Sequence, residues 1–193
     1  MDTNKINLKF YLEKGQDTDP ETWFEVFNTW IPDTPDEVLI DVADYSHVHR
    51  GPVTLLVGHE ANYSIDNTDG RRGLLYDRKQ PLEGTAGHRI GSALSKAVAA
   101  CVRLEDEPRF SGSVRFLGNE FLLVLNDRLL APNTGETLEA IQEHLDSVVS
   151  VFYSGSAHSV DHTGDSNGRF TLLVKSEGPS AMAKLMENLD GVF

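Results

Sequence analysis

The chain has 193 residues, of which 30 are acidic and 17 basic, so its formal net charge is −13. A charge of this sign and size repels phosphate backbones and anionic lipid, which disfavours general nucleic-acid binding and membrane-surface binding. The single cysteine, Cys101, excludes an internal disulfide and any metal cluster made of cysteines alone. A hydrophobic fraction of 39% is ordinary for a globular protein and argues against disorder.

The length fits one domain, which we expect to span 1–193, with a possible subdivision near 80–86. The first residues contain no apolar run of signal-peptide length. No later segment approaches the roughly 18 apolar residues that a membrane span needs. We therefore expect a soluble, cytoplasmic protein.

Hydrophobic periodicity predicts the elements of the first half in chain order. A short strand is expected over 6–12. Asp19 followed by Pro20 marks the start of a helix, in which Trp23, Val26, Phe27, Trp30 and Ile31 recur at the spacing of one apolar face. Strands are expected over 38–42, over 53–65 and, after the turn sequence DNTDG at 66–70, over 74–76.

The second half begins with a helix rich in small residues over about 86–104. Gly118-Asn119 predicts a tight turn between two strands, and a further helix begins at Asn133 or Thr134. A polar loop at about 154–168 precedes a last strand over 170–174 and a short helix after Gly178-Pro179. The predicted order is β-α-β-β-β-α-β-β-α-β-α, which indicates an α+β fold: a mainly antiparallel sheet with helices packed on it.

Several catalytic and nucleotide-binding motifs are missing from the sequence. There is no G-x-x-x-x-G-K-[ST] phosphate loop, no G-x-G-x-x-G turn and no G-x-S-x-G nucleophile elbow. His59-Glu60 is not followed by a second histidine at the spacing of zinc proteases. The motifs therefore point to no particular enzyme class.

The stretch DYSHVHRGPVTLLVGHE at 44–60 nevertheless concentrates metal-ligating residue types. His47 and His49 are two residues apart, so in an extended strand both imidazoles leave the same face. A hairpin through Gly51-Pro52 would bring the next strand alongside and supply His59 or Glu60 as a third ligand. Two histidines and a carboxylate suffice for a catalytic Zn or Fe site, so a metal-dependent enzyme is one hypothesis.

Strand alternation argues against that hypothesis. In a regular strand over 53–65, His59 shares a face with Val57 and Tyr63 and points into the core, while Glu60 points away. A bulge at Gly58 or a different strand order would be needed to bring a third ligand to His47 and His49. Without either, we expect a hairpin with a buried His59, and no bound metal or cofactor.

A second candidate site is the basic stretch RRGLLYDRK at 71–79, which stands out in an acidic chain. Alternation places Arg72, Tyr76 and Arg78 on one face together with Leu74. Basic groups around an aromatic ring favour binding of an anionic ligand or an acidic partner, and we predict a site formed by Arg71, Arg72, Tyr76, Arg78 and Lys79. The alternative is an ordinary charged edge strand.

Taken together, the segments GPVTLLVGHEANYSID, RRGLLYDRK and NDRLLAPNTGET resemble a family of uncharacterised bacterial proteins of about this length. The likeness covers most of the chain. What the resemblance implies is a bacterial, soluble, single-domain protein, and it implies no activity.

Our leading hypothesis is a non-enzymatic binding protein that recognises an anionic small molecule or an acidic protein partner through Arg71–Lys79. We also expect homo-oligomers formed through the small-residue helix at 86–104. The competing hypothesis is the metal-dependent enzyme with His47, His49 and His59 or Glu60.

Overall fold

The computed structural model describes residues 4–14, 18–164 and 167–193. Its strands are β1 (Ile6–Leu12), β2 (Leu39–Asp44), β3 (Pro52–Gly58), β4 (Ala61–Asp66), β5 (Gly73–Arg78), β6 (Phe116–Leu125), β7 (His158–Thr163) and β8 (Phe170–Ser176). Its helices are α1 (Pro20–Asp33), α2 (Ala86–Glu105), α3 (Gly135–Phe152) and α4 (Met182–Leu189), and a short 3-10 turn spans Pro108–Phe110.

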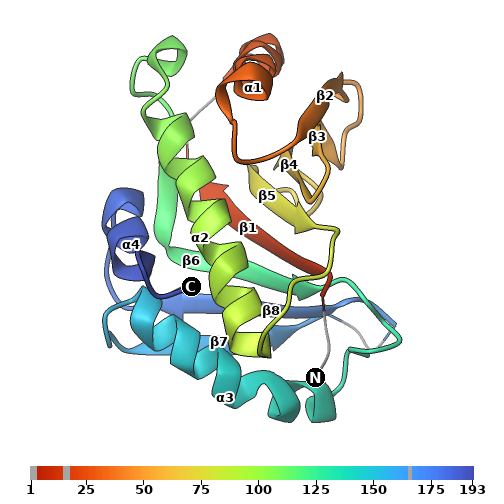
Figure 1. Cartoon of the computed structure of the whole chain (residues 1–193), viewed down its shortest axis with the longest axis vertical. Coiled ribbons are helices and arrows are strands. Elements are labelled where there is room, and N and C mark those ends of the chain that lie inside the picture. The colour runs from red at the N-terminus through yellow and green to blue at the C-terminus, as the bar shows by residue number, and fades with distance from the viewer. Residues whose placement is uncertain (1–3, 15–17, 165–166) are drawn as a thin grey trace.

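The eight strands form one sheet in the order β2-β3-β4-β5-β1-β6-β8-β7, and every neighbouring pair is antiparallel (Figure 1). The predicted α+β class, the mainly antiparallel sheet and the succession of strand groups and helices are confirmed. Strand β1 lies at the centre and pairs with both β5 and β6. It therefore joins the strands that come before 80–86 to those that come after.

All four of these helices cover the same face of the sheet (Figure 1). On β1 this face carries Ile6, Leu8 and Phe10, whose cross-strand neighbours on β6 are Leu125, Leu123 and Phe121, and all six side chains are buried. Helix α2 packs on β1 and β5, and α3 and α4 pack on α2. We call this the helix side of the sheet and the other face the open side.

The strand predicted over 53–65 is in fact a hairpin. Strand β3 ends at Gly58 and β4 begins at Ala61, with His59 and Glu60 as the exposed turn between them. The prediction of a buried His59 was therefore wrong. This turn lacks the Asn-Gly or Asp-Gly pair that usually marks a two-residue hairpin, so no turn was predicted there.

The hairpin predicted at Gly118-Asn119 is in fact one continuous strand, β6. Gly118 lies inside it, where a Cβ atom would collide with the carbonyl oxygen of Ser180. The glycine is therefore required by the close approach of another backbone segment and not by a turn.

Part of the predicted polar loop at 154–168 forms strand β7, which pairs with β8 at the sheet edge. Its burial alternates weakly, because the strand is flanked on one side only. Residues 165–166 of that loop lie outside the described part of the chain.

The small residues of α2 allow close packing within the chain. The ring of Phe193 lies against Gly91, so that a Cβ atom at Gly91 would overlap it, whereas Gly87 has only ordinary contacts with His144 and Val148 of α3. Thr85 caps the helix by accepting a hydrogen bond from the backbone N–H of His88. Among the described helices, none is long and apolar enough to cross a membrane.

We expect the two glycine substitutions Gly91→Ala and Gly87→Ala in α2 to have opposite effects. Gly87→Ala should raise the free energy of unfolding by about 0.5–1 kcal/mol, because alanine loses less backbone entropy on folding. Gly91→Ala should lower it by about 1–3 kcal/mol, because Phe193 must move. Urea unfolding of the two variants measures both, and equal effects would contradict this packing of the chain end on α2.

Candidate functional site

The basic stretch at 71–79 does not form one cluster. Alternation along β5 places Leu74, Tyr76 and Arg78 on the helix side, as the sequence predicted, and all three are buried there. Arg71 precedes the strand and reaches Glu120 on the open side, so Arg71 and Arg78 lie on opposite faces of the sheet. The five predicted residues are therefore not brought together.

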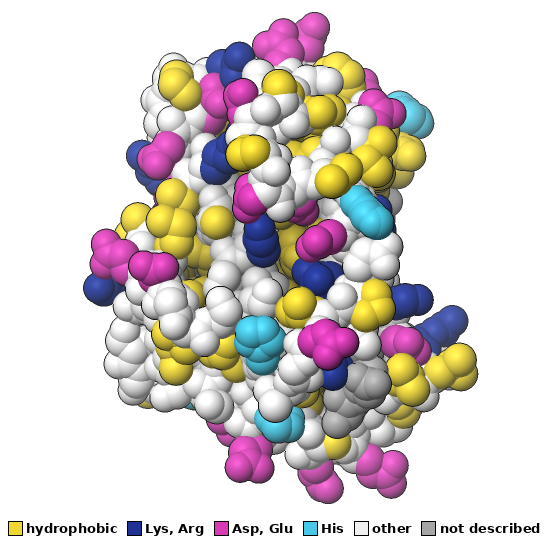
Figure 2. Space-filling view, viewed as in Figure 1, with side chains coloured by type: hydrophobic (Ala, Val, Ile, Leu, Met, Phe, Trp, Pro, Cys, Tyr) yellow, Lys and Arg dark blue, Asp and Glu magenta, His cyan; other side chains and the backbone are white. Residues whose placement is uncertain are grey.

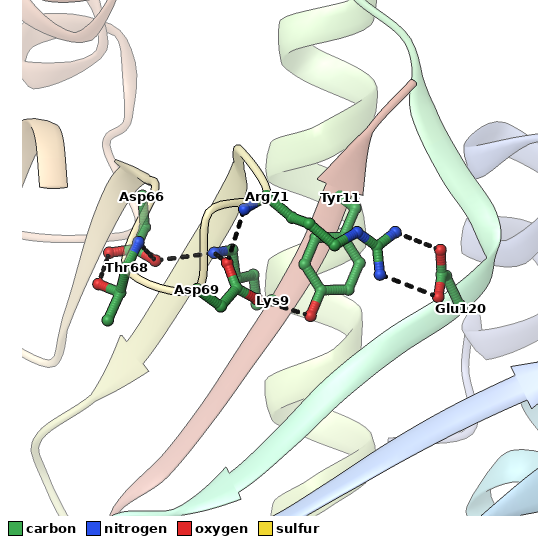
Figure 3. A network of polar contacts seen from close by, with 7 residues as sticks. All are labelled: Lys9, Tyr11, Asp66, Thr68, Asp69, Arg71 and Glu120. Atoms are coloured by element: carbon green, nitrogen blue, oxygen red, sulfur yellow. Dashed lines mark hydrogen bonds and ion pairs between the residues drawn. The ribbon is translucent and has the colours of Figure 1, made fainter. Parts of the chain in front are cut away.

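Arg71 is already engaged by the protein itself. Its guanidinium forms a two-pronged ion pair with the carboxylate of Glu120 on β6 and lies 3.6 Å from the ring centroid of Tyr11 (Figure 3). The hydrogen bonds to Glu120 raise the pKa of Arg71. This is the arrangement of a structural clamp between a loop and two strands.

Two further members of the stretch also have partners. Lys79 donates from Nζ to the backbone carbonyl of Gly58. Arg72 is half-buried and has an interaction of its own. Neither offers a free cation for a ligand.

Arg78 differs from the other four residues because its charge is buried without close compensation. Its side chain is 7% exposed, and its nearest carboxylate oxygen, Oε2 of Glu60, lies 3.8 Å from Nη1 on a side chain that is 56% exposed. Nη1 lies 3.4 Å from the hydroxyl oxygen of Tyr76. The buried Nε has no hydrogen-bond partner among the described residues. A buried guanidinium without a close carboxylate is unfavourable in free energy, and a bound anion would reduce that cost.

Aromatic rings continue from Arg78 across the helix side of the sheet. The ring of Tyr76 lies 5.3 Å from that of Tyr63, which lies 6.0 Å from that of Trp30 at the end of α1. Burial, and then the neighbouring Glu37 carboxylate that accepts from its hydroxyl, raise the pKa of Tyr63. The hydroxyl of Tyr63 thus remains a neutral donor.

A cleft of about 180 Å³ opens beside these rings, between α2, the end of α1 and β2. Its lining includes Trp30, Glu37, Tyr63, Lys96, Ala100 and Arg103. Arg103 stacks over the Trp30 ring at 4.4 Å and donates to Thr34. Figure 2 shows the molecule hollowed on this side between α2 and the strands β4 and β5, with basic and acidic side chains around the hollow.

The histidine stretch is also divided by the fold. His47 and His49 lie in the exposed loop between β2 and β3, whereas His59 and Glu60 form the turn at the opposite end of β3. The seven residues of β3 separate the two places by roughly 20 Å. Within the described ranges, no group of three or more His, Cys, Asp or Glu side chains is placed to hold a metal.

The open side of the sheet carries a polar network that sequence reasoning missed (Figure 3). Lys9 on β1 donates from Nζ to Asp66 at 2.9 Å and to Asp69 at 2.6 Å. Asp69 also accepts from the hydroxyl of Tyr11 at 2.9 Å, and Asp66 accepts from the hydroxyl of Thr68 at 2.6 Å. The available signal was Lys9, the one charged residue of the strand INLKFYL, together with the carboxylates in the turn DNTDG.

The network shifts the pKa values of Asp69 and Tyr11. Burial alone would raise the pKa of Asp69, but the hydrogen bond and charge of Lys9 and the hydrogen bond from Tyr11 outweigh it, so the pKa of Asp69 is lowered. Burial, followed by the bond to Asp69, raises the pKa of Tyr11. Lys9 and its carboxylates thus form a compensated charge cluster, in contrast to Arg78.

No protein-family model and no curated protein matches this sequence.

The two buried cations should respond differently to replacement by methionine. Lys9→Met leaves Asp66, whose side chain is 5% exposed, without its cation, and we expect a loss of about 3–5 kcal/mol of unfolding free energy. Arg78→Met removes a poorly compensated charge, so we expect no loss or a gain of about 1 kcal/mol. Urea unfolding compares the variants, and an equal loss in both would show that Arg78 is as well paired as Lys9.

Acid should weaken the network through Asp69. Its folded pKa is lowered, so between the folded and unfolded pKa values the unfolded state binds more protons. The stabilisation is therefore fully present above about pH 5 and is lost as the pH falls through the folded pKa. We expect Asp69→Asn to be less stable at pH 7 and to show a shallower fall in unfolding free energy between pH 5 and pH 3, measured by urea titration at each pH. An unchanged acid slope would contradict this assignment.

Proposed function

We propose that this chain is a non-enzymatic binding protein that holds a small anionic molecule on the helix side of its sheet, in the hollow between α2 and the strands β4 and β5. Arg78 is the anion contact. The adjoining cleft is lined by Tyr63 and Trp30, and the buried ring of Tyr76 lies between Arg78 and Tyr63 in the sheet without lining the cleft. The proposal keeps the anionic ligand predicted from the sequence and assigns it to one residue of the basic stretch. It includes a cytoplasmic location in a bacterium, as composition and resemblance predict.

The observation that carries the proposal is the incomplete pairing of Arg78. Structural arginines are normally bound by carboxylates at hydrogen-bond distance, as Arg71 is by Glu120. Among the described residues, Arg78 has a long hydrogen bond to the Tyr76 hydroxyl at 3.4 Å, a carboxylate at 3.8 Å and a buried Nε that lacks a partner. A carboxylate or phosphate group of a ligand would supply the missing acceptors, because the planar guanidinium fits both groups.

The aromatic surface supports a ligand with an apolar or planar part. Tyr63 and Trp30 line the cleft, and two cations of α2, Lys96 and Arg103, stand along it. In the part of the chain that the structure describes, Lys96 pairs with Asp36 at 3.3 Å. Both side chains are exposed, so this ion pair has a small energy and an anionic ligand can displace it. Ligand pockets typically combine such an apolar wall with few polar contacts.

Homo-oligomer formation through α2 stays a prediction. Part of the small-residue surface of α2 packs within the chain, against Phe193 and α3. The metal-dependent enzyme also stays a prediction. Its four residues lie at two places, His47 and His49 at one end of β3 and His59 and Glu60 at the other.

Anion binding can be tested by thermal unfolding with inorganic phosphate and with benzoate, which joins a carboxylate to a ring. A ligand at about ten times its Kd stabilises by about 1.4 kcal/mol, so the Tm should rise by about 3–5 °C. We expect at least one of the two anions to give a saturable rise in the wild type and none in Arg78→Gln.

Arg109→Gln is the matched control, because Arg109 is an exposed arginine that pairs with Glu107 away from the hollow. It should retain the full rise. The proposal fails if neither anion shifts the wild type, or if Arg78→Gln responds as the wild type does.

A further inference from the structure

The open side of the sheet bears a second polar site, separate from the hollow and from Arg78. Asn7 on β1, Asp77 on β5 and Asn62 on β4 are direct cross-strand neighbours. Side chains at such positions leave the sheet on one face, with Cβ atoms about 4.5–5.5 Å apart. They therefore form a row of three oxygen-bearing groups on the face that the described helices leave uncovered.

Two side-chain oxygens of this row have no hydrogen-bond partner among the described residues. Asn7 is 3% exposed, and its side-chain oxygen is buried. The side-chain oxygen of Asn62 is buried as well, and neither oxygen has a hydrogen-bond partner in the described ranges. A buried acceptor without a hydrogen bond destabilises the fold, so these two oxygens call for a donor from outside the chain.

Asp77 adds a carboxyl group between the two amides. Burial raises the pKa of Asp77, and the charges of Lys79, Arg169 and Lys5 only partly oppose this effect. The carboxylate form is thus short of compensation, and a donor that carried positive charge would satisfy it together with the amide oxygens.

Asn7 lines a depression of about 130 Å³, several times the roughly 30 Å³ that one water molecule occupies in the liquid. Its other lining residues are Lys9, Asp66, Thr68, Asp69, Leu75, Leu122, Val124, Arg169 and Thr171, so Asp77 adjoins the depression through its cross-strand neighbour Asn7. The charge of Lys9 is compensated by Asp66 and Asp69. Arg169 is exposed, and within the described ranges its guanidinium has no hydrogen bond or ion pair. The depression thus combines the side-chain oxygen of Asn7, the guanidinium of Arg169 and the aliphatic side chains of Leu75, Leu122 and Val124.

We infer that this depression binds a small zwitterion of the α-amino acid type, with its ammonium group at Asn7, beside the neighbouring carboxylate of Asp77, and its carboxylate at Arg169. An ammonium group brings three donors and a positive charge, which the acceptor row lacks. A carboxylate matches the planar fork of a guanidinium. The volume limits the ligand to one with a small side chain, which would contact Leu75 and Leu122.

The test is a calorimetric titration with glycine, L-alanine and L-serine, beside acetate and methylammonium as the two halves of the ligand. We expect at least one amino acid to bind with a Kd of about 1 mM or below, and both halves to bind at least tenfold more weakly. Equal binding of acetate, or no binding of any amino acid up to about 10 mM, would overturn the inference; the second result would leave ordered water as the partner of Asn7.

Variants test the two ends of the ligand separately. Arg169→Gln changes an exposed side chain and should weaken amino-acid binding at least tenfold while the Tm without ligand stays unchanged. Asp77→Asn should also weaken binding at least tenfold. Lys175→Gln, an exposed change on the same face on β8, is the matched control and should bind as the wild type does. Undiminished binding in Arg169→Gln would refute the inference, whatever the phosphate and benzoate experiment gives, since Arg78 lies on the other side of the sheet.

Discussion

The pairing of Lys9 with Asp66 and Asp69 is the constraint on which the centre of this fold depends. The lysine sits on the central strand β1, and its carboxylates come from the end of β4 and from the turn between β4 and β5. An ammonium group in a nearly buried position is tolerated only when its partners are held close. The network therefore fixes the β4–β5 turn over β1, and through Tyr11 and Arg71 it extends to Glu120 on β6. The two halves of the sheet are joined by charge on the open side and by hydrophobic packing on the helix side.

The fold class could be predicted because it depends on local patterns that the structure keeps. The three-four spacing of Trp23, Val26, Phe27 and Trp30 gives a helix whose face is buried, and Asp19 and Thr134 cap helices as their residue types suggest. The wrong predictions concern two turns, because a glycine can mark either a turn or a close approach of two backbone segments. Gly118-Asn119 is typical of a turn in sequence, but Gly118 lies inside a strand, where the backbone of Ser180 approaches too closely for a Cβ atom. The turn at His59-Glu60 contains no residue that usually marks a turn. Only the tertiary contact distinguishes these cases.

The candidate site was predictable in residue type but not in arrangement. A basic stretch at 71–79 was visible, yet strand alternation and burial separate its members: Arg71 is paired on the open side and Arg78 is buried on the helix side. The predicted histidine group is divided for a related reason, because the extra hairpin turn places His59 at the end of β3 away from His47. The Lys9 network depends on contacts between residues nearly sixty positions apart in the sequence, such as Lys9 and Asp66, which no single-sequence pattern specifies.

Three buried polar side chains of the central strands, Lys9, Arg78 and Asn7, differ in how well the protein itself pairs them. Lys9 has two carboxylates within hydrogen-bond distance, so its burial is explained by the fold alone. Arg78 on β5 and Asn7 on β1 are as deeply buried but lack equivalent partners in the described chain. Folding stability does not favour leaving such groups unsatisfied, and sites that bind ligands commonly carry this cost in the free state. The contrast with Lys9, in the same sheet and at similar burial, is the reason that we propose ligands as the partners of Arg78 and Asn7.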